Sequence, residues 1–196
     1  MEKCVLASNN EHKLKEFREI LNDREILSLK DINFYEDIEE NGSTFEENCL
    51  IKARTIAKYL KEKGLNYVVL ADDTGLCVDA LNGEPGIFSA RYAGGHGNNQ
   101  ANRDLVLKNL QGKKDRSAHF KCVIAEVKPD GKELIVEGRT NGRILEEERG
   151  DKSFGYDCIF YSDDLGKAFG EASAEEKNSV SHRGRALESL LKKEQI

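Results

Sequence analysis

The sequence predicts an α/β protein whose sheet has an antiparallel part, and three observations predict this class. A continuous apolar run at residues 67–71 is typical of a parallel strand that helices cover on both faces. A short apolar run at residues 3–7 precedes a helical pattern. Two β-rich runs flank the turn sequence Pro129-Asp130-Gly131.

The first predicted element is a short buried strand over residues 3–7. Ser8, Asn9 and Asn10 end this strand, because these residue types favour turns. Apolar residues then recur at helical spacing, at Leu14, Phe17, Ile20 and Leu21. The beginning of the chain is therefore predicted to be a strand, a loop and a helix.

A second helix is predicted after the break at Asn41-Gly42. Ser43 and Glu46 match a capping box at its start, and Gly64 ends it after about residue 63. One stripe of apolar residues runs along the predicted helix: Leu50, Ala53, Ala57 and Leu60. We expect this stripe to face the core.

The later elements are the central strand at residues 67–71, a hairpin and a final helix. The hairpin pairs residues 118–127 with residues 133–137, and the helix begins at about His182. No repeat, low-complexity segment or linker interrupts the chain. Residues 1–196 are therefore predicted to form a single domain.

The composition limits the possible functions. With 196 residues, 38% of them hydrophobic, the chain can bury one good core. It has no long apolar span and no secretory signal, so we expect a cytoplasmic protein without a membrane partner. A net charge of −6 argues against a nucleic-acid polymer as partner, although it allows a small anion to bind at local lysines. The five scattered cysteines lack C-x-x-C spacing and are expected to be buried thiols.

Asp72 and Asp73 follow the central apolar run, at the place where open α/β sheets bind their ligands. Mg²⁺ prefers one or two carboxylates together with substrate phosphates, so a metal site is the favoured interpretation. Glu40 could supply a further oxygen ligand. The alternative is an ordinary turn, where adjacent aspartates are common, with Glu40 on a solvated face.

Ser8, Asn9, Asn10 and Lys13 form a polar loop at the start of a predicted helix, where backbone N–H groups and the helix dipole favour phosphate. The pattern is neither a P-loop nor a dinucleotide fingerprint, because the required glycines are absent. The alternative is an ordinary helix start with an exposed lysine.

The segment from residue 154 to residue 157 combines two aromatic rings with a glycine and a carboxylate. Phe154 and Tyr156 offer ring faces for a base, Gly155 allows close approach, and Asp157 is an acceptor. Hydrogen-bond donors follow at Lys177, His182 and Arg183. Taken singly, each of these residues could equally be a core aromatic or an exposed base.

Taken together, these segments resemble the inosine/xanthosine triphosphate pyrophosphatase family. Six blocks occur in the family's order and nearly span the chain: Ser8-Asn9-Asn10-x-x-Lys13, Gly42-x-Thr44-Phe45-x-Glu47-Asn48-x-x-x-Lys52-Ala53, Ala71-Asp72-Asp73-Thr74-Gly75-Leu76-x-Val78-Asp79-Ala80-Leu81, Pro85-Gly86-x-x-Ser89-Ala90-Arg91-Tyr92, Phe154-Gly155-Tyr156-Asp157 and Glu176-Lys177-x-x-x-Ser181-His182-Arg183. The family usually has Ser at Thr74, Gly at Ser153 and Pro at Cys158. None of these departures removes a required functional group.

The resemblance implies an elongated mixed β-sheet flanked by helices, with two lobes around a central cleft, and a homodimer. It implies Mg²⁺-dependent hydrolysis of deaminated purine nucleoside triphosphates (ITP, dITP and XTP) to the nucleoside monophosphate and pyrophosphate. By matching positions, Glu40 and Asp73 would bind the metal with Asp72 beside them, and Asp73 would accept the proton. The substrate would be bound by Ser8, Asn9, Asn10, Glu11, His12, Lys13, Lys52, Thr74, Phe154, Gly155, Tyr156, Asp157, Lys177, His182 and Arg183.

Two other functions are compatible with the acidic pair. An aspartyl-phosphate phosphatase also uses a carboxylate at a strand end together with Mg²⁺. Its aspartates are usually one residue apart and near the N-terminus, unlike Asp72 and Asp73. A nucleotide-binding module without turnover is the third possibility, and the phosphate product that is released would separate all three.

Overall fold

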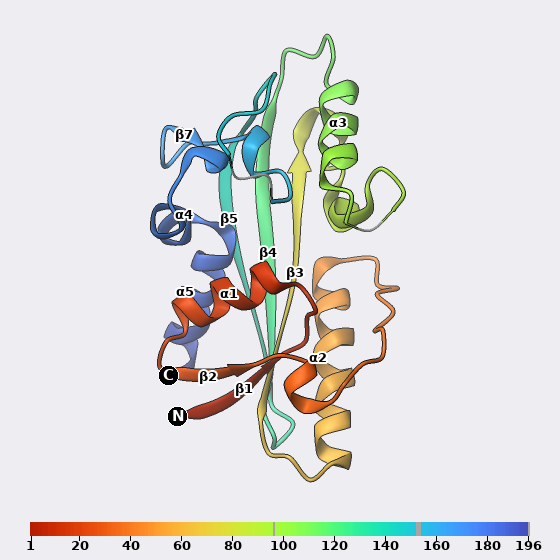
Figure 1. Cartoon of the computed structure of the whole chain (residues 1–196), viewed down its shortest axis with the longest axis vertical. Helices are drawn as coiled ribbons and strands as arrows, with labels where there is room; N and C mark the ends of the chain where they lie inside the picture. Colours follow the sequence, from red (N-terminus) through yellow and green to blue (C-terminus); the bar gives the residue numbers. More distant parts are fainter. Residues whose placement is uncertain (96, 152–153, 196) are drawn as a thin grey trace. The chain divides into compact units, whose positions relative to one another are not determined.

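The computed structural model describes residues 1–95, 97–151 and 154–195, which form a seven-stranded mixed sheet flanked by helices (Figure 1). The strand order is β2-β1-β3-β4-β5-β6-β7. β1 pairs in parallel with β2 and with β3, whereas β6 pairs in antiparallel with β5 and with β7. The strands are β1 (Glu2–Leu6), β2 (Arg24–Leu27), β3 (Val68–Val78), β4 (Ser117–Val127), β5 (Glu133–Ile144), β6 (Phe160–Ser162) and β7 (Lys167–Ala168). The predicted α/β class with an antiparallel part is confirmed.

Five α-helices occur among the described residues: α1 (Glu11–Ile20), α2 (Phe45–Glu62), α3 (Asn99–Asn109), α4 (Ala174–Val180) and α5 (His182–Glu194). None of the described helices is long and apolar enough to cross a membrane. The predicted final helix is confirmed, and it begins at His182 as expected.

The chain divides into two compact units. The first comprises Met1–Asp73, Val123–Glu137 and Ala186–Ile196, and the second comprises Thr74–Cys122 and Gly138–Arg185. In the first unit, α2 lies on one side of the strands, and α1 and α5 lie on the other (Figure 1). The single domain and the central cleft expected from the sequence stay predictions.

The first unit begins with the predicted strand, loop and helix. Asn10 caps α1, because its side-chain oxygen accepts hydrogen bonds from the backbone N–H groups of His12 and Lys13 at 3.0 and 3.2 Å. Leu14 and Phe17 then bury the inner face of the helix. The polar loop is therefore fixed in place by the sheet on one side and the helix cap on the other.

The start of α2 corrects the predicted capping box by one residue. Thr44, not Ser43, is the N-cap, and its hydroxyl accepts the Glu47 N–H at 3.1 Å. The Glu47 carboxylate returns to the Ser43 N–H at 2.6 Å. Both Ser43 and Thr44 have a glutamate three residues later, so local sequence does not choose between them, whereas the later start buries Phe45 in the core.

The buried face of α2 also differs from the predicted stripe. Ala53 and Leu60 are buried as expected, but Leu50 and Ala57 are only half-buried. The buried face instead carries these residues: Phe45, Asn48, Cys49, Lys52, Ala53, Ile56 and Leu60. Two polar side chains, Asn48 and Lys52, therefore enter the interior of the first unit.

The central strand is longer than predicted. β3 continues through Asp72 and Asp73 to Val78, so the acidic pair lies within a strand rather than after its end. The acidic pair was expected beyond the carboxyl end of a strand, and it does lie beyond the end of the neighbouring strand β1. The last residue of β1, Leu6, pairs with Leu70, so β1 ends just before the register position of Asp72. The strand continues because β4 remains beside it and because lysines neutralise the acidic pair.

The hairpin and the cysteines agree with the predictions. β4 and β5 are joined by a turn in which the Gly131 N–H donates to the Lys128 carbonyl at 2.9 Å, although β5 runs on to Ile144. All five cysteines are buried thiols, as expected.

Glu126 on β4 is a fully buried carboxyl group in the first unit. Arg24 Nη1 lies 3.9 Å from its Oε2 and Lys128 Nζ lies 3.6 Å from its Oε1. Burial raises the pKa of Glu126 to about 7, and the neighbouring Glu194 carboxylate adds to this rise. The two cations lower the pKa but do not cancel the rise. Arg24 also donates to Glu194 at 3.0 Å, which joins β2 to the end of α5.

We expect Glu126→Gln to stabilise the protein above pH 7. The folded chain holds a proton on Glu126 up to about pH 7, whereas the unfolded chain loses it near pH 4.5, so this group lowers stability as pH rises between these values. Glutamine cannot ionise, and at pH 8 the melting temperature should rise by about 2–4 °C, equivalent to about 1 kcal/mol. Thermal melts from pH 4 to 8 measure this, with the exposed Glu25→Gln as control. An identical pH profile for Glu126→Gln and the wild type would contradict the assignment.

Candidate functional site

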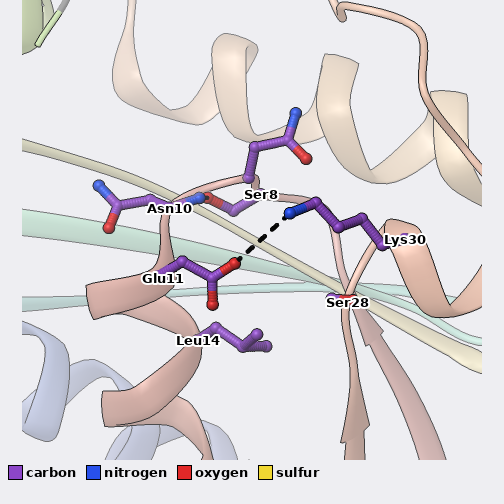
Figure 2. Close-up of a pocket in the computed structure, with 7 residues that line it drawn as sticks. Ser8, Asn10, Glu11, Leu14, Ser28 and Lys30 are labelled. Atoms are coloured by element: carbon purple, nitrogen blue, oxygen red, sulfur yellow. Dashed lines mark hydrogen bonds and ion pairs between the residues drawn. The ribbon is translucent and has the colours of Figure 1, made fainter.

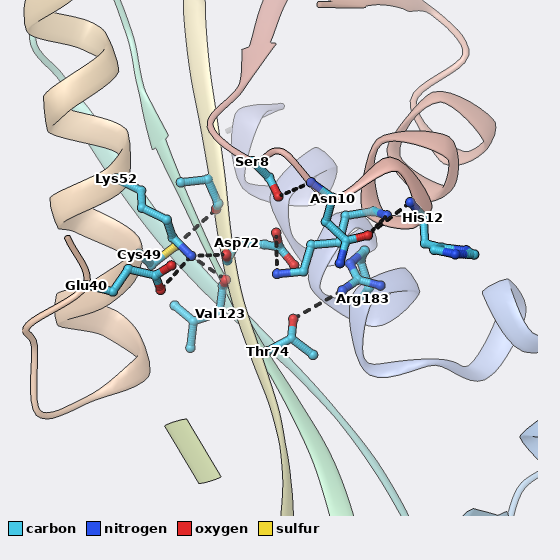
Figure 3. A network of polar contacts seen from close by, with 12 residues as sticks. Ser8, Asn10, His12, Glu40, Cys49, Lys52, Asp72, Thr74, Val123 and Arg183 are labelled. Carbon is cyan, nitrogen blue, oxygen red and sulfur yellow. Dashed lines mark hydrogen bonds and ion pairs between the residues drawn. The ribbon is translucent and has the colours of Figure 1, made fainter. Parts of the chain in front are cut away.

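In the first unit two lysines contact Asp72 of β3, and Figure 3 shows Lys52 beside Glu40 and Asp72. Lys13 Nζ lies 3.1 Å from Asp72 Oδ1, and Lys52 Nζ donates to the Asp72 carbonyl at 2.8 Å. Lys52 also donates to Glu40 Oε2 at 3.0 Å. Four of the predicted site residues, from α1, α2, β3 and the loop before α2, therefore form one network of contacts.

The charges of this network depend on one another. Asp72 is 0% exposed, and Asp73 and Lys52 are each 7% exposed. Burial disfavours the Lys52 ammonium, but the carboxylates of Asp73, Glu40 and Asp72 outweigh it and raise the Lys52 pKa. Burial likewise raises the pKa of Asp73, while Lys52 and Lys13 oppose it. Lys52 therefore stays charged, and Asp73 is a stronger base than an exposed carboxylate.

The predicted metal ligands are hard oxygen donors, which suit Mg²⁺. Within residues 1–95, 97–151 and 154–195, no three His, Cys, Asp or Glu side chains converge to hold a metal by themselves. The predicted grouping of Glu40, Asp72 and Asp73 is therefore not a closed cage, because Lys52 lies against Glu40. Mg²⁺ completes its coordination with phosphates and water, so one or two of these carboxylates fit the ion.

The polar loop before α1 lines a small pocket together with residues from the loop after β2 (Figure 2). Its lining residues are Ser8, Asn9, Asn10, Glu11, Leu14, Ser28 and Lys30. Lys30 Nζ lies 4.0 Å from Glu11 Oε1, and Glu11 and His12 are exposed. Backbone N–H groups at this helix start were predicted to favour phosphate, and those of His12 and Lys13 donate to the side chain of Asn10, which is the helix cap.

The second unit contains the remaining predicted residues. Lys177 Nζ lies 2.7 Å from Asp157 Oδ2, and both residues are buried. The same ammonium lies 5.7 Å from the centroid of the half-buried Phe154 ring. Tyr156 is 5% exposed and belongs to the core, and its hydroxyl donates to the Ser89 carbonyl at 2.6 Å. Phe154 is therefore the better placed of the two rings for stacking.

Arg183 and His182 lie at the start of α5 and are both buried. Arg183 Nη2 donates to the Thr74 hydroxyl at 3.3 Å (Figure 3). The hydroxyl group that threonine shares with the family's usual serine therefore has a hydrogen-bond partner. The His182 ring stacks on Phe120, with centroids 4.7 Å apart. Ser153, one of the departures from the family pattern, lies outside the described residues.

Sequence reasoning missed three buried polar residues beside the predicted ones. Asn48 accepts the Gly42 N–H at 2.8 Å and also hydrogen-bonds Asp73, which partly opposes the rise that burial causes in the Asp73 pKa. Ser89 and Arg103 contact the segment from residue 154 to residue 157. Asn48 and Ser89 stand within the quoted blocks, but no local signal distinguishes Arg103 from an exposed arginine on an amphipathic helix.

The chain is thus a mixed α/β protein with buried lysine–carboxylate pairs, one set in each unit. Comparison with known families identifies it further. The model of the Ham1 family matches residues 4–193, and the chain belongs to this family.

Its relatives agree in sequence and in fold. A dITP/XTP pyrophosphatase of Clostridium perfringens is 51% identical, covering 97% of this chain and 96% of that protein. A dITP/XTP pyrophosphatase of Bacillus subtilis is 45% identical, covering 98% and 96%. The solved structure of a HAM1 protein from Coxiella burnetii matches with a TM-score of 0.85 and 44% identity, covering 97% and 96% of the two chains.

Replacing Lys177 by Met should destabilise the protein by roughly 3–5 kcal/mol, because it removes the ammonium from the buried Asp157 carboxylate. Urea unfolding at pH 7 measures the change. Lys167→Met is the matched control, since Lys167 makes a 2.7 Å ion pair with Glu176 on the surface of the same unit. That variant should change stability by about 1 kcal/mol or less. Equal effects of the two substitutions would contradict the importance of burial.

Proposed function

We propose that this chain hydrolyses deaminated purine nucleoside triphosphates (ITP, dITP and XTP) to the nucleoside monophosphate and pyrophosphate. The names of its relatives support the activity, since proteins 45–51% identical to it are dITP/XTP pyrophosphatases. The observation that carries the proposal is the buried network in which Lys13 of α1 and Lys52 of α2 contact Asp72 of β3. A buried network of opposite charges suits a substrate that is itself a polyanion carrying a metal.

The first unit would bind the triphosphate. Lys13 and Lys52 are the cations for the phosphates, and residues 8–12 supply hydroxyl, amide and backbone groups at the start of α1. Glu40, Asp72 and Asp73 would hold Mg²⁺, which when bound polarises the attacking water and neutralises charge on the leaving pyrophosphate. Substrate phosphates then replace carboxylates as partners of the lysines, so the total charge of the site stays compensated.

Asp73 would accept the proton of the attacking water. Burial raises the pKa of Asp73 and favours proton uptake, whereas a bound Mg²⁺ would lower that pKa. The water oxygen attacks the α-phosphorus, and the bond between that phosphorus and the oxygen bridging to the β-phosphorus breaks. The electron pair of this bond leaves with pyrophosphate.

The second unit would bind the base. Hypoxanthine and xanthine present a 6-oxo acceptor and an N1–H donor. Arg183 or His182 could donate to the first, and Asp157 could accept from the second. Phe154 offers its half-buried ring for stacking. Thr74, Gly155, Tyr156 and Lys177 complete the proposed set.

The remaining parts of the proposal rest on the family resemblance. These are the homodimer, the cytoplasmic location and Mg²⁺ as the particular metal. An aspartyl-phosphate phosphatase is less well supported, because Asp72 and Asp73 are buried within β3 rather than exposed on a nucleophile loop, and Asp72 is ion-paired with Lys13. Release of pyrophosphate rather than orthophosphate would decide between these enzymes.

Asp73→Asn should lower kcat by roughly 10²-fold or more, because an amide cannot accept the proton of the water. Pyrophosphate released from ITP in the presence of Mg²⁺ is the quantity to measure. Asp79→Asn, an exposed aspartate just after β3, is the control and should leave kcat near the wild-type value. Wild-type turnover by Asp73→Asn would refute the assigned base.

The rate on ATP should be at least about tenfold below the rates on ITP and XTP. Adenine places a 6-amino donor against cationic donors, and a buried donor that is left unsatisfied costs roughly 1–3 kcal/mol. Pyrophosphate release from ITP, XTP, GTP and ATP under identical conditions tests this. Equal kcat/KM values for ITP and ATP would exclude the role given to Arg183.

A further inference from the structure

Arg103 of α3 is only 2% exposed and contacts the segment from residue 154 to residue 157, the proposed base-binding segment. Its guanidinium donates in three directions. Nε donates to Glu148 Oε1 at 2.7 Å, Nη2 to Gln100 Oε1 at 2.7 Å, and Nη1 to the carbonyl of Gly155 at 2.9 Å. One rigid planar group therefore joins α3 and the segment around Glu148 to the backbone of the base-binding segment.

The segment that carries Glu148 is held firmly as well. The N–H of Arg149 donates to the Cys158 carbonyl at 2.8 Å, and the N–H of Leu145 donates to the Ile159 carbonyl at 2.8 Å. The Glu148 pKa is lowered, first by its hydrogen bond from Arg103 and also by Gln100, so it stays a carboxylate. Arg103 thus has a fixed anionic partner that sets the orientation of its guanidinium.

Three consecutive residues of the base-binding segment have separate anchors. Arg103 holds the Gly155 carbonyl, the Ser89 carbonyl accepts the Tyr156 hydroxyl, and Lys177 holds the Asp157 carboxylate. Asn102, adjacent to Arg103 on α3, lies 3.4 Å from the same Ser89 carbonyl through Nδ2. Helix α3 therefore contributes to two of the three anchors, although no sequence block of the family resemblance includes it.

We propose that Arg103, oriented by Glu148, is a positioning residue that determines base selectivity by fixing the segment from residue 154 to residue 157. The inference rests on the proposed function, in which this segment meets the base. Arg103 does not need to touch the base. It sets the place of the Gly155 backbone, and thereby the places of the Phe154 ring and the Asp157 carboxylate on either side.

Arginine suits this task because its five donors lie in one plane with fixed directions. A lysine at the same position keeps the positive charge near Glu148 but has a single nitrogen, which cannot reach three acceptors in different directions. The carbonyl of Gly155 would then lose its anchor. Small displacements of groups that contact a substrate can lower the rate by large factors. Loss of the Gly155 anchor should therefore reduce the discrimination between similar bases first.

Arg103→Lys and the milder Glu148→Gln test the proposal. The measured quantity is the ratio of kcat/KM for ITP to kcat/KM for ATP, from pyrophosphate release, together with the Kd ratio of IMP to AMP by calorimetry. In Arg103→Lys we expect the kcat/KM ratio to fall by about tenfold and the Kd ratio to rise by about tenfold, and in Glu148→Gln we expect smaller changes in the same directions. The rate on ATP should change much less than the rate on ITP.

Arg116→Lys is the matched control. Arg116 lies in the same unit and its guanidinium also donates to backbone carbonyls, those of Ile144 and Leu145, both at 2.7 Å. Its replacement should lower the melting temperature without changing either ratio. If Arg103→Lys lowers the melting temperature and leaves both ratios unchanged, Arg103 is merely structural. The same conclusion follows if Arg103→Lys fails to fold and Glu148→Gln keeps both wild-type ratios. A wild-type protein that releases no pyrophosphate from any of these nucleotides would overturn the proposed function, whereas a selective wild type with equally selective variants overturns only the role of Arg103.

Discussion

The structure depends on the compensation of two carboxylates buried in the middle of a strand. Asp72 and Asp73 lie in β3, where aspartate is normally disfavoured. A buried charge that loses its partner costs several kcal/mol, so the fold must supply cations at this place. It does so with Lys13 at the first turn of α1 and with Lys52 on the buried face of α2. The placement of both helices against the strand is therefore tied to the charges of the acidic pair.

The second unit solves a related problem in another way. Asp157 is matched by Lys177, and the backbone around Gly155 is held by Arg103, which is matched in turn by Glu148. Here the buried ions contact two residues of the proposed base-binding segment. Buried ion pairs contribute little net stability compared with apolar packing, so their presence in both units points to a demand other than stability.

In the proposed function, that demand is the recognition of a charged ligand. The Ham1 family membership and the pyrophosphatase relatives indicate a nucleoside triphosphate, whose phosphates need cations and whose base needs oriented polar groups. In the proposed function, the first unit meets the first need and the second unit meets the second. Asp73 and Thr74 are neighbours in β3 but belong to different units, so one strand supplies residues to both.

The sequence by itself determined the elements that follow from local patterns. Periodicity gave the helices around Phe17 and Ile56, the turn at Gly131 predicted the hairpin, and the continuous apolar run predicted a strand buried on both faces. The tertiary structure alone decided that this strand continues through Asp72 and Asp73, that Thr44 rather than Ser43 caps α2, and that Arg103 is buried against Gly155. The physical reason is that each of these outcomes depends on a partner distant in the sequence. A lysine or an arginine looks the same in a local pattern whether it meets water or a buried carboxylate, and only the folded chain brings that carboxylate to it.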